Sequence, residues 1–175
     1  MELPGGGPTQ PEVMAVSLAK LDVQPGDTAA DIGCGTGTVT KAIAALAGRT
    51  GHVYAVDRRT AAVSITKETC AGLSQVEVIE GEAAAFLAAP HKKIDSAFCG
   101  GSRDISAIIA RLDEEGCRNI VVNAVLIETV VDAIHAMQEL GIFREAVHLQ
   151  VSRSCELTKR IMFKPINPIY IIYGG

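Results

Sequence analysis

The residues best suited to chemistry form a glycine-rich loop, Asp31-Ile32-Gly33-Cys34-Gly35-Thr36-Gly37, and an acid that follows it, Asp57. Alternate glycines carry no side chain, so a ligand can lie directly against the backbone. The loop leads into the helix-like stretch Thr38 to Leu46, and free N–H groups at a helix N-terminus face such a ligand. Asp57 ends the strand-like run His52–Val56, where an acid can bind both hydroxyls of a ribose. This spacing predicts a nucleoside-cofactor site in an α/β sheet.

Alternating strand-like and helix-like runs surround this loop. The strand-like runs are nearly continuous in apolar residues, which is typical of a parallel sheet covered on both faces. The alternation predicts a doubly wound, Rossmann-like fold. The strand-like runs are Thr28–Ile32, His52–Val56, Val76–Glu80, Ile94–Cys99 and Asn119–Ala124. The helix-like runs are Thr38–Ala47, Ala61–Cys70, Ala83–Ala88, Ile105–Glu115 and Ile127–Leu140.

The two ends of the chain follow other patterns. Residues 1–8 predict a flexible arm, and Thr9-Gln10-Pro11-Glu12 predicts a capping box that opens a helix. Near the other end, Ala146–Val151 and Ile169–Tyr173 predict two strands with no long helix between them. We expect these two strands to pair antiparallel at one edge of the sheet.

Length and composition restrict the class of protein. A chain of 175 residues with 48% hydrophobic and 21% charged residues predicts one globular domain. The net charge of −4 argues against a broad nucleic-acid surface, because such surfaces need a basic patch. No apolar run approaches the roughly 20 residues of a membrane span, and the N-terminus lacks the pattern of a signal peptide. Five scattered cysteines without C-x-x-C spacing indicate free thiols in a reducing cytoplasm, and no metal site is expected.

The glycine spacing distinguishes between nucleoside cofactors. In the dinucleotide fingerprint G-x-G-x-x-G the third glycine would stand at Thr38, but here it stands at Gly37. The pattern D-x-G-x-G-x-G instead resembles motif I of the class I S-adenosylmethionine (SAM) methyltransferases. The resemblance implies that SAM is the cofactor, that the loop lies beside its amino-acid end and that Asp57 holds its ribose. It also implies a mostly parallel sheet with an antiparallel C-terminal strand.

Later segments resemble one subfamily over nearly the whole chain. They are Gly100-Gly101-Ser102, Asn123-Ala124-Val125 and the ending that begins Asn167-Pro168-Ile169. They are similar to the cobalt-precorrin-6B C15-methyltransferases (decarboxylating), or precorrin-8w decarboxylases, of cobalamin biosynthesis. This resemblance implies SAM-dependent methylation of C15 of a tetrapyrrole and decarboxylation of its ring-C (C12) acetate. It also implies a homo-oligomer, most simply a tetramer, and a possible separate chain for C5 methylation.

The resemblance assigns roles to residues of this sequence. The cofactor residues would be Thr9, Asp31, Gly33, Cys34, Gly35, Thr36, Gly37, Asp57, Glu82 and Ala83. The substrate pocket would hold Gly100, Gly101, Ser102, Arg103 and Asn123. Because the substrate carries carboxylates, Arg103 and Arg153 are candidate ligands, whereas Lys159 and Arg160 are better explained as solvated surface charges. Two interpretations remain for the apolar residues of the tail, an interface between copies of the chain or, for part of the set, burial inside the sheet; these residues are Ile166, Ile169, Ile171 and Ile172.

Two other functions are compatible with the loop. One is a class I methyltransferase acting on tRNA or another small molecule. A tRNA enzyme would be expected to show a basic face, and none is visible. The other is a non-catalytic partner that keeps a nucleoside pocket, against which the intact Asp31, glycine loop and Asp57 argue.

Overall fold

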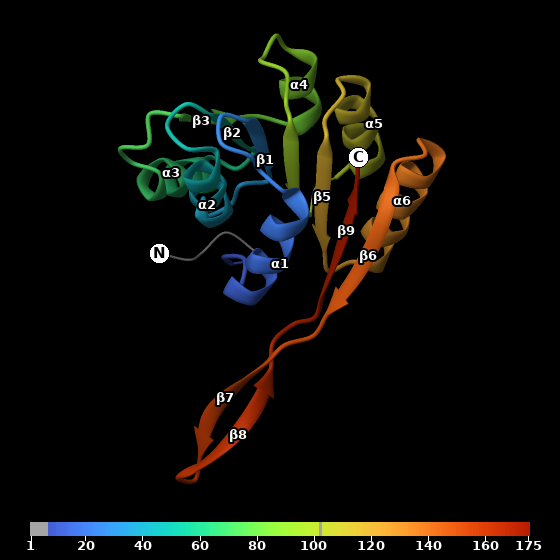
Figure 1. Cartoon of the computed structure of the whole chain (residues 1–175). Coiled ribbons are helices and arrows are strands. Elements are labelled where there is room, and N and C mark those ends of the chain that lie inside the picture. The colour runs from blue at the N-terminus through green and yellow to red at the C-terminus, as the bar shows by residue number, and fades with distance from the viewer. Residues whose placement is uncertain (1–6, 102) are drawn as a thin grey trace.

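A seven-stranded sheet forms the centre of the molecule, with the strand order β3-β2-β1-β4-β5-β9-β6 (Figure 1). The computed structural model describes residues 7–101 and 103–175, so residues 1–6 of the expected arm lie outside the described residues. The strands of this sheet are β1 Thr28–Ile32, β2 His52–Asp57, β3 Val76–Glu80, β4 Ser96–Gly100, β5 Asn119–Ala124, β6 Phe143–Leu149 and β9 Ile169–Gly174. The five strands β1 to β5 are mutually parallel, as the sequence predicts.

β9, the C-terminal strand, runs antiparallel to both of its neighbours in the sheet. β9 pairs antiparallel with β5, with Val122 opposite Ile172, and antiparallel with β6, with Ala146 opposite Ile172. The predicted antiparallel tail is therefore confirmed, although β6 begins at Phe143 rather than Ala146. The α/β class with an antiparallel C-terminal strand is confirmed as well.

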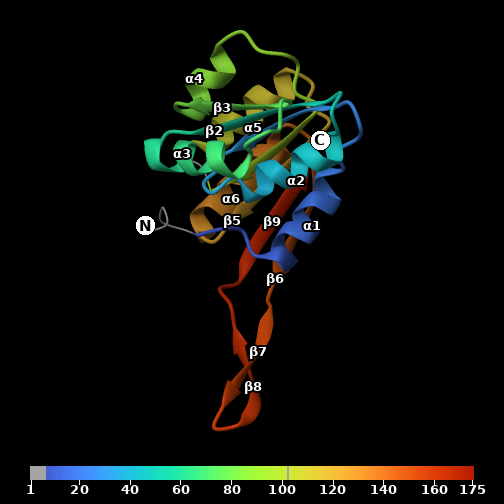
Figure 2. The same ribbon diagram turned by 90° about the vertical axis from the view of Figure 1, so that its left-hand side faces the viewer.

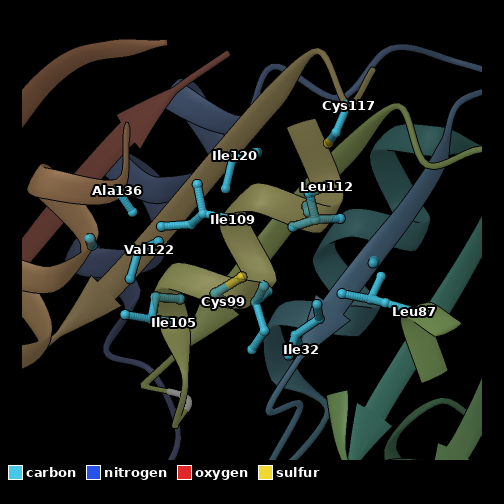
Figure 3. Packing of buried hydrophobic residues seen from close by; sticks show 14 of the residues in the cluster. Ile32, Leu87, Cys99, Ile105, Ile109, Leu112, Cys117, Ile120, Val122 and Ala136 are labelled. Carbon is cyan, nitrogen blue, oxygen red and sulfur yellow. The ribbon is translucent and has the colours of Figure 1, made fainter. Parts of the chain in front are cut away.

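Helices cover both faces of the sheet. They are α1 Pro11–Leu21, α2 Thr38–Ala47, α3 Thr60–Thr69, α4 Ala83–Ala88, α5 Ile105–Glu114 and α6 Ile127–Glu139. On one face, side chains of α4, α5 and α6 pack with Ile120 and Val122 of β5, and Figure 3 shows Ile109 and Leu112 of α5 in this cluster. On the other face, α1 and α2 pack against a second cluster that includes Val121. Val121 and Val122 enter opposite clusters because successive side chains of a strand alternate between faces. No helix in the described part of the chain is long and apolar enough to cross a membrane.

The start of α1 differs from the prediction. Its N-cap is Gln10, no side chain caps it, and Pro11 occupies its first turn. The predicted capping box at Thr9 is therefore wrong. The carboxylate of Glu12 instead accepts a hydrogen bond from Nε of Arg153 at 3.0 Å, and this tertiary contact replaces the local one.

A β-hairpin that the sequence analysis did not predict leaves the body of the molecule (Figures 1 and 2). It consists of β7 Ser152–Leu157 and β8 Arg160–Pro165, which pair only with each other. Thr158 and Lys159 join the strands with φ angles of 50° and 58°, the two left-handed residues of a type I′ turn. The strands carry the exposed apolar residues Leu157, Ile161, Met162 and Phe163.

The apolar tail residues are not all at the surface. Ile171 and Ile172 are fully buried on opposite faces of β9. These two residues therefore follow the second alternative, burial inside the sheet, because residues of α6 cover one face of β9 and residues of α1 cover the other. Ile169 is partly buried against the second cluster.

Candidate functional site

Two adjoining cavities open near the carboxyl ends of the parallel strands, where open α/β sheets bind ligands. The first has a volume of about 510 Å³ and is lined by the glycine loop, by residues 7–10 and by residues 165–167 at the base of the hairpin. The second, of about 440 Å³, is lined by Asp57, by residues 81–83 and by Arg103. The cavities share the lining residues Gly33, Arg59, Gly100 and Gly101.

The glycine loop is tied to β2 and leaves space over its middle residue. The N–H groups of Gly33 and Cys34 both donate to the carbonyl of Val56, at 2.8 and 3.1 Å. Gly37 has a φ of 73°, and a Cβ atom there would lie 3.0 Å from Cα of Thr66 on α3. A Cβ atom at Gly35 would meet nothing closer than 3.8 Å. Gly37 therefore serves the packing of the loop on α3, whereas Gly35 keeps space open at the first cavity.

Asp31 presents a buried carboxylate to the first cavity. Thr40 on α2 donates its hydroxyl to Oδ2 at 2.5 Å, whereas Oδ1 has no partner in the described part of the chain. Burial raises the pKa of Asp31 to about 7, and the nearby charge of Asp57 adds to this, whereas the hydrogen bonds from Thr40 oppose it. A buried acceptor without a partner is costly, so Oδ1 is suited to a ligand that brings a donor or a positive charge.

Asp57 lies at the end of β2 with both carboxylate oxygens engaged. Its Oδ2 accepts from the N–H of Gly35 at 3.0 Å and from Nη2 of Arg59 at 2.8 Å. Its Oδ1 accepts from the N–H and from Nε of Arg59, at 3.0 and 2.9 Å. Burial alone would raise the pKa of Asp57, but the hydrogen bonds from Arg59 and Gly35 outweigh it and lower the pKa. Asp57 is therefore an ionised acceptor.

The other predicted cofactor residues divide between the two cavities. Thr9, Cys34 and Thr36 line the first, and Glu82 and Ala83 line the second. Burial, followed by the charge of Asp31, raises the pKa of Cys34 to about 12, so its thiol stays neutral and the residue contributes shape and backbone rather than a nucleophile. The carboxylate of Glu82 is exposed and lies 3.8 Å from Arg58.

The predicted substrate residues have different surroundings. Gly100 and Gly101 line both cavities, and Arg103 is exposed on the second, just before α5. Ser102 lies outside the described residues. Asn123 lines the first cavity, but its side-chain amide is hydrogen-bonded to the hydroxyl of Ser17 on α1. The distances from this hydroxyl to Nδ2 and Oδ1 of Asn123 are 2.9 and 3.0 Å. Asn123 thus fastens α1 to β5.

The remaining basic candidates lie elsewhere. Arg153 pairs with Glu12 and does not line either cavity, so its expected role as a substrate ligand is not supported by its position. Lys159 belongs to the hairpin turn and Arg160 begins β8, which agrees with the interpretation of both as surface charges.

Arg59 was not singled out from the sequence, and neither were Val125 and Leu126, which form an apolar rim where the two cavities adjoin. Both rim residues are 63% exposed; Val125 lines the first cavity and Leu126 the second. The sequence did offer one indication of a role for Arg59, because it stands two residues after Asp57, the acid expected to bind the ribose. Within the described part of the chain, no group of three or more His, Cys, Asp or Glu side chains could hold a metal ion.

Comparison with known proteins identifies the family. Residues 5–173 match the model of the precorrin methyltransferase domain. The chain belongs to this family. A precorrin methyltransferase relative from Methanosarcina acetivorans, named as a probable cobalt-precorrin-6B C(15)-methyltransferase (decarboxylating), is 49% identical over 97% of this chain and 94% of its own length. A relative of the same name from Sulfolobus acidocaldarius is 36% identical over 95% of this chain and 88% of its own length.

Solved structures agree with this membership of the precorrin methyltransferase family. The precorrin 8w decarboxylase of Methanobacterium thermoautotrophicum superposes with a TM-score of 0.88 at 31% identity, over 99% of this chain and 93% of its own. A SAM-dependent O-methyltransferase from Thermotoga maritima superposes with a TM-score of 0.77 at 18% identity, over 95% of this chain and 65% of its own, which shows a shared fold alone.

Proposed function

We propose that this chain methylates C15 of a cobalt-precorrin with SAM and decarboxylates the C12 acetate of the same tetrapyrrole. The observation that carries the proposal is the 49% identity to a relative of that named activity along nearly the full length of both chains. Two adjoining cavities at the glycine loop, one for each end of an extended cofactor, support it.

The residues of the two cavities fit SAM. The unpartnered Oδ1 of Asp31 suits the ammonium group of the amino-acid end, and Gly35 leaves space beside it. Asp57 suits the ribose, and Glu82 with Ala83 suits the adenine in the second cavity. When bound, SAM supplies a methyl group on a sulfonium centre. The contribution of the protein is to hold the acceptor carbon in line with that group, because such transfers depend mainly on positioning.

The substrate pocket lies where the two cavities adjoin, at Gly100 and Gly101. Gly100 and Gly101 expose backbone there, and Val125 and Leu126 offer an apolar surface to the face of a flat macrocycle. Arg103 offers a guanidinium, which can bind a carboxylate through two hydrogen bonds. Decarboxylation breaks the bond between the acetate methylene and its carboxylate. Carbon dioxide leaves, the conjugated ring takes up the electron pair, and a proton from water completes the new methyl group.

We further propose a homotetramer held together by the hairpin. Ile161 and Phe163 are 73% and 68% exposed and lie on one face of β8, because alternate residues of a strand share a face. A two-stranded hairpin is at best marginally stable alone in water, so contact with other copies of the chain would stabilise this one. A separate chain for C5 methylation and a cytoplasmic location, which suits five free cysteines, complete the proposal.

Mass spectrometry of cobalt-precorrin-6B incubated with SAM and the protein tests the reaction. The expected product gains one methyl group and loses one carbon dioxide. Methylation without decarboxylation would contradict the proposal. Methyl transfer to tRNA in a parallel incubation would favour the alternative substrate class instead.

A further inference from the structure

The carboxylate of Asp57 has no acceptor position left for a ribose. Each of its two oxygens has room for about two hydrogen bonds. Oδ1 accepts from the N–H and from Nε of Arg59, and Oδ2 accepts from the N–H of Gly35 and from Nη2 of Arg59. A ribose can therefore bind Asp57 only if one pair of these donors leaves.

The two pairs of donors differ in their freedom to move. The N–H groups of Gly35 and Arg59 belong to the backbone, and the neighbouring loop residues Gly33 and Cys34 are bonded to β2. The other two donors belong to the guanidinium of Arg59, whose side chain is 40% exposed, whereas that of Asp57 is 3% exposed. The guanidinium is thus the pair of donors that can leave Asp57 without a change in the backbone, whereas the carboxylate stays buried.

The guanidinium also resembles a ribose in the way it binds. A guanidinium fork places one donor on each oxygen of a carboxylate. The two neighbouring hydroxyls of a ribose offer the same pair of donors, again one for each oxygen. Arg59 further lines both cavities, so it borders the region where a ligand would extend from one cavity to the other.

We propose that the guanidinium of Arg59 occupies the ribose position on Asp57 and is exchanged for the two ribose hydroxyls when the cofactor binds. Arg59 is then a positioning residue. It keeps Asp57 ionised and oriented before binding, and it lowers cofactor affinity by competing for the same two acceptor positions. This inference rests on the proposed SAM site at Asp57.

Titration calorimetry on the full chain tests the exchange with three probes: S-adenosylhomocysteine, adenosine and 2′,3′-dideoxyadenosine. In Arg59→Met the competitor is absent, so we expect S-adenosylhomocysteine to bind about fivefold more tightly, about 1 kcal/mol, the upper range for a partly exposed ion pair. Adenosine should gain by the same factor. 2′,3′-Dideoxyadenosine lacks both hydroxyls and should bind Arg59→Met and the wild type equally.

Two further variants separate the effect of the bidentate geometry of the Arg59 guanidinium from the effect of its positive charge. Arg59→Lys keeps the charge but not the bidentate geometry, and its affinity for S-adenosylhomocysteine should lie between those of the wild type and Arg59→Met. Arg58→Met removes a neighbouring positive charge that is 3.8 Å from Glu82, and it should leave the ratio of adenosine to 2′,3′-dideoxyadenosine affinity unchanged. A thermal unfolding scan establishes that each variant is folded.

The possible results are distinct. Equal or weaker binding of S-adenosylhomocysteine by folded Arg59→Met would overturn the exchange. A gain for 2′,3′-dideoxyadenosine equal to that for adenosine would also overturn it, because the effect would not involve the hydroxyls. Failure of the wild type to bind S-adenosylhomocysteine would instead overturn the proposed cofactor site.

Discussion

Thr40 on α2 donates its hydroxyl to one carboxylate oxygen of Asp31 on β1, and the second oxygen of Asp31 is buried at the first cavity without a partner among the described residues. The hydrogen bond from Thr40 to Oδ2 of Asp31 connects α2 to the sheet. The other oxygen is buried without a hydrogen bond from the described residues.

The raised pKa of Asp31 predicts a pH-dependent cost to stability. Burial raises the pKa to about 7 from the ordinary value of 3.8, so between these values the folded chain binds more protons than the unfolded chain. Asp31 should therefore lower the free energy of unfolding as the pH rises through this window, with no further loss above it. Asp31→Asn should be more stable than the wild type at pH 8, by on the order of 2–4 kcal/mol, and the difference should shrink toward pH 4. Urea unfolding across this range measures it, and a constant difference would contradict the assignment.

Asp57→Ala should weaken binding of S-adenosylhomocysteine. It removes two charge-assisted hydrogen bonds to the ribose, each worth about 1.5–3 kcal/mol as an upper range, and release of Arg59 offsets part of the loss. Glu80→Ala is the matched control, since Glu80 ends the neighbouring strand β3 and its carboxylate accepts a hydrogen bond from the hydroxyl of Thr60 at 2.6 Å. Calorimetric titration compares the two variants. If Asp57→Ala kept the affinity of the wild type, the ribose assignment would be lost.

Gly35→Val and Gly37→Ala should fail for different reasons. A side chain at Gly35 fills space at the first cavity, so S-adenosylhomocysteine binding should be lost. The φ of 57° at Gly35 adds strain that lowers the melting temperature, but a Cβ atom there meets nothing closer than 3.8 Å, so the fold persists. A side chain at Gly37 would press on the backbone of Thr66, and its positive φ adds strain of about 1 kcal/mol or more, so the melting temperature should fall. Melting scans with and without ligand separate these outcomes, and unfolding of Gly35→Val would show that Gly35 is structural.

Arg103→Ala should weaken binding of the cobalt-precorrin more than binding of SAM. Arg103 is exposed on the second cavity, and the change leaves the glycine loop untouched. Losing one exposed charged contact should cost about 1 kcal/mol or somewhat more. Lys159→Ala, in the hairpin turn, is the control. Separate titrations with the two ligands measure both affinities, and equal losses for both would remove Arg103 from the substrate pocket.

Charges on the hairpin should dissociate the proposed tetramer. Ile161→Glu with Phe163→Glu would place two carboxylates in the interface that we propose, whereas neither side chain belongs to the two core clusters. Sedimentation at micromolar concentration should show a tetramer for the wild type and smaller species for the variant, with similar melting of the monomer fold. A monomeric wild type would exclude this interface.

Several features of the site follow from residues that are close in sequence. The glycine loop, the strand before it and the helix after it form one continuous segment, so their spacing alone indicated the cofactor site. The alternation of strands and helices likewise indicated a parallel sheet, since parallel neighbours require such crossovers. The prediction failed at Thr9, because Gln10 is the N-cap of α1 and the carboxylate of Glu12 accepts a hydrogen bond from Arg153.

The sequence by itself determined the fold class, the position of the cofactor loop and the family of this chain, because these depend on local periodicity, glycine spacing and motifs read in order. Only the tertiary structure decided which donors occupy Asp57, that Ser17 holds Asn123 and that both faces of β9 are buried. It also decided that residues 152–165 leave the body as a hairpin. Each of these outcomes depends on partners brought together by chain folding or on strand pairing, and the spacing of residues along the chain does not specify them.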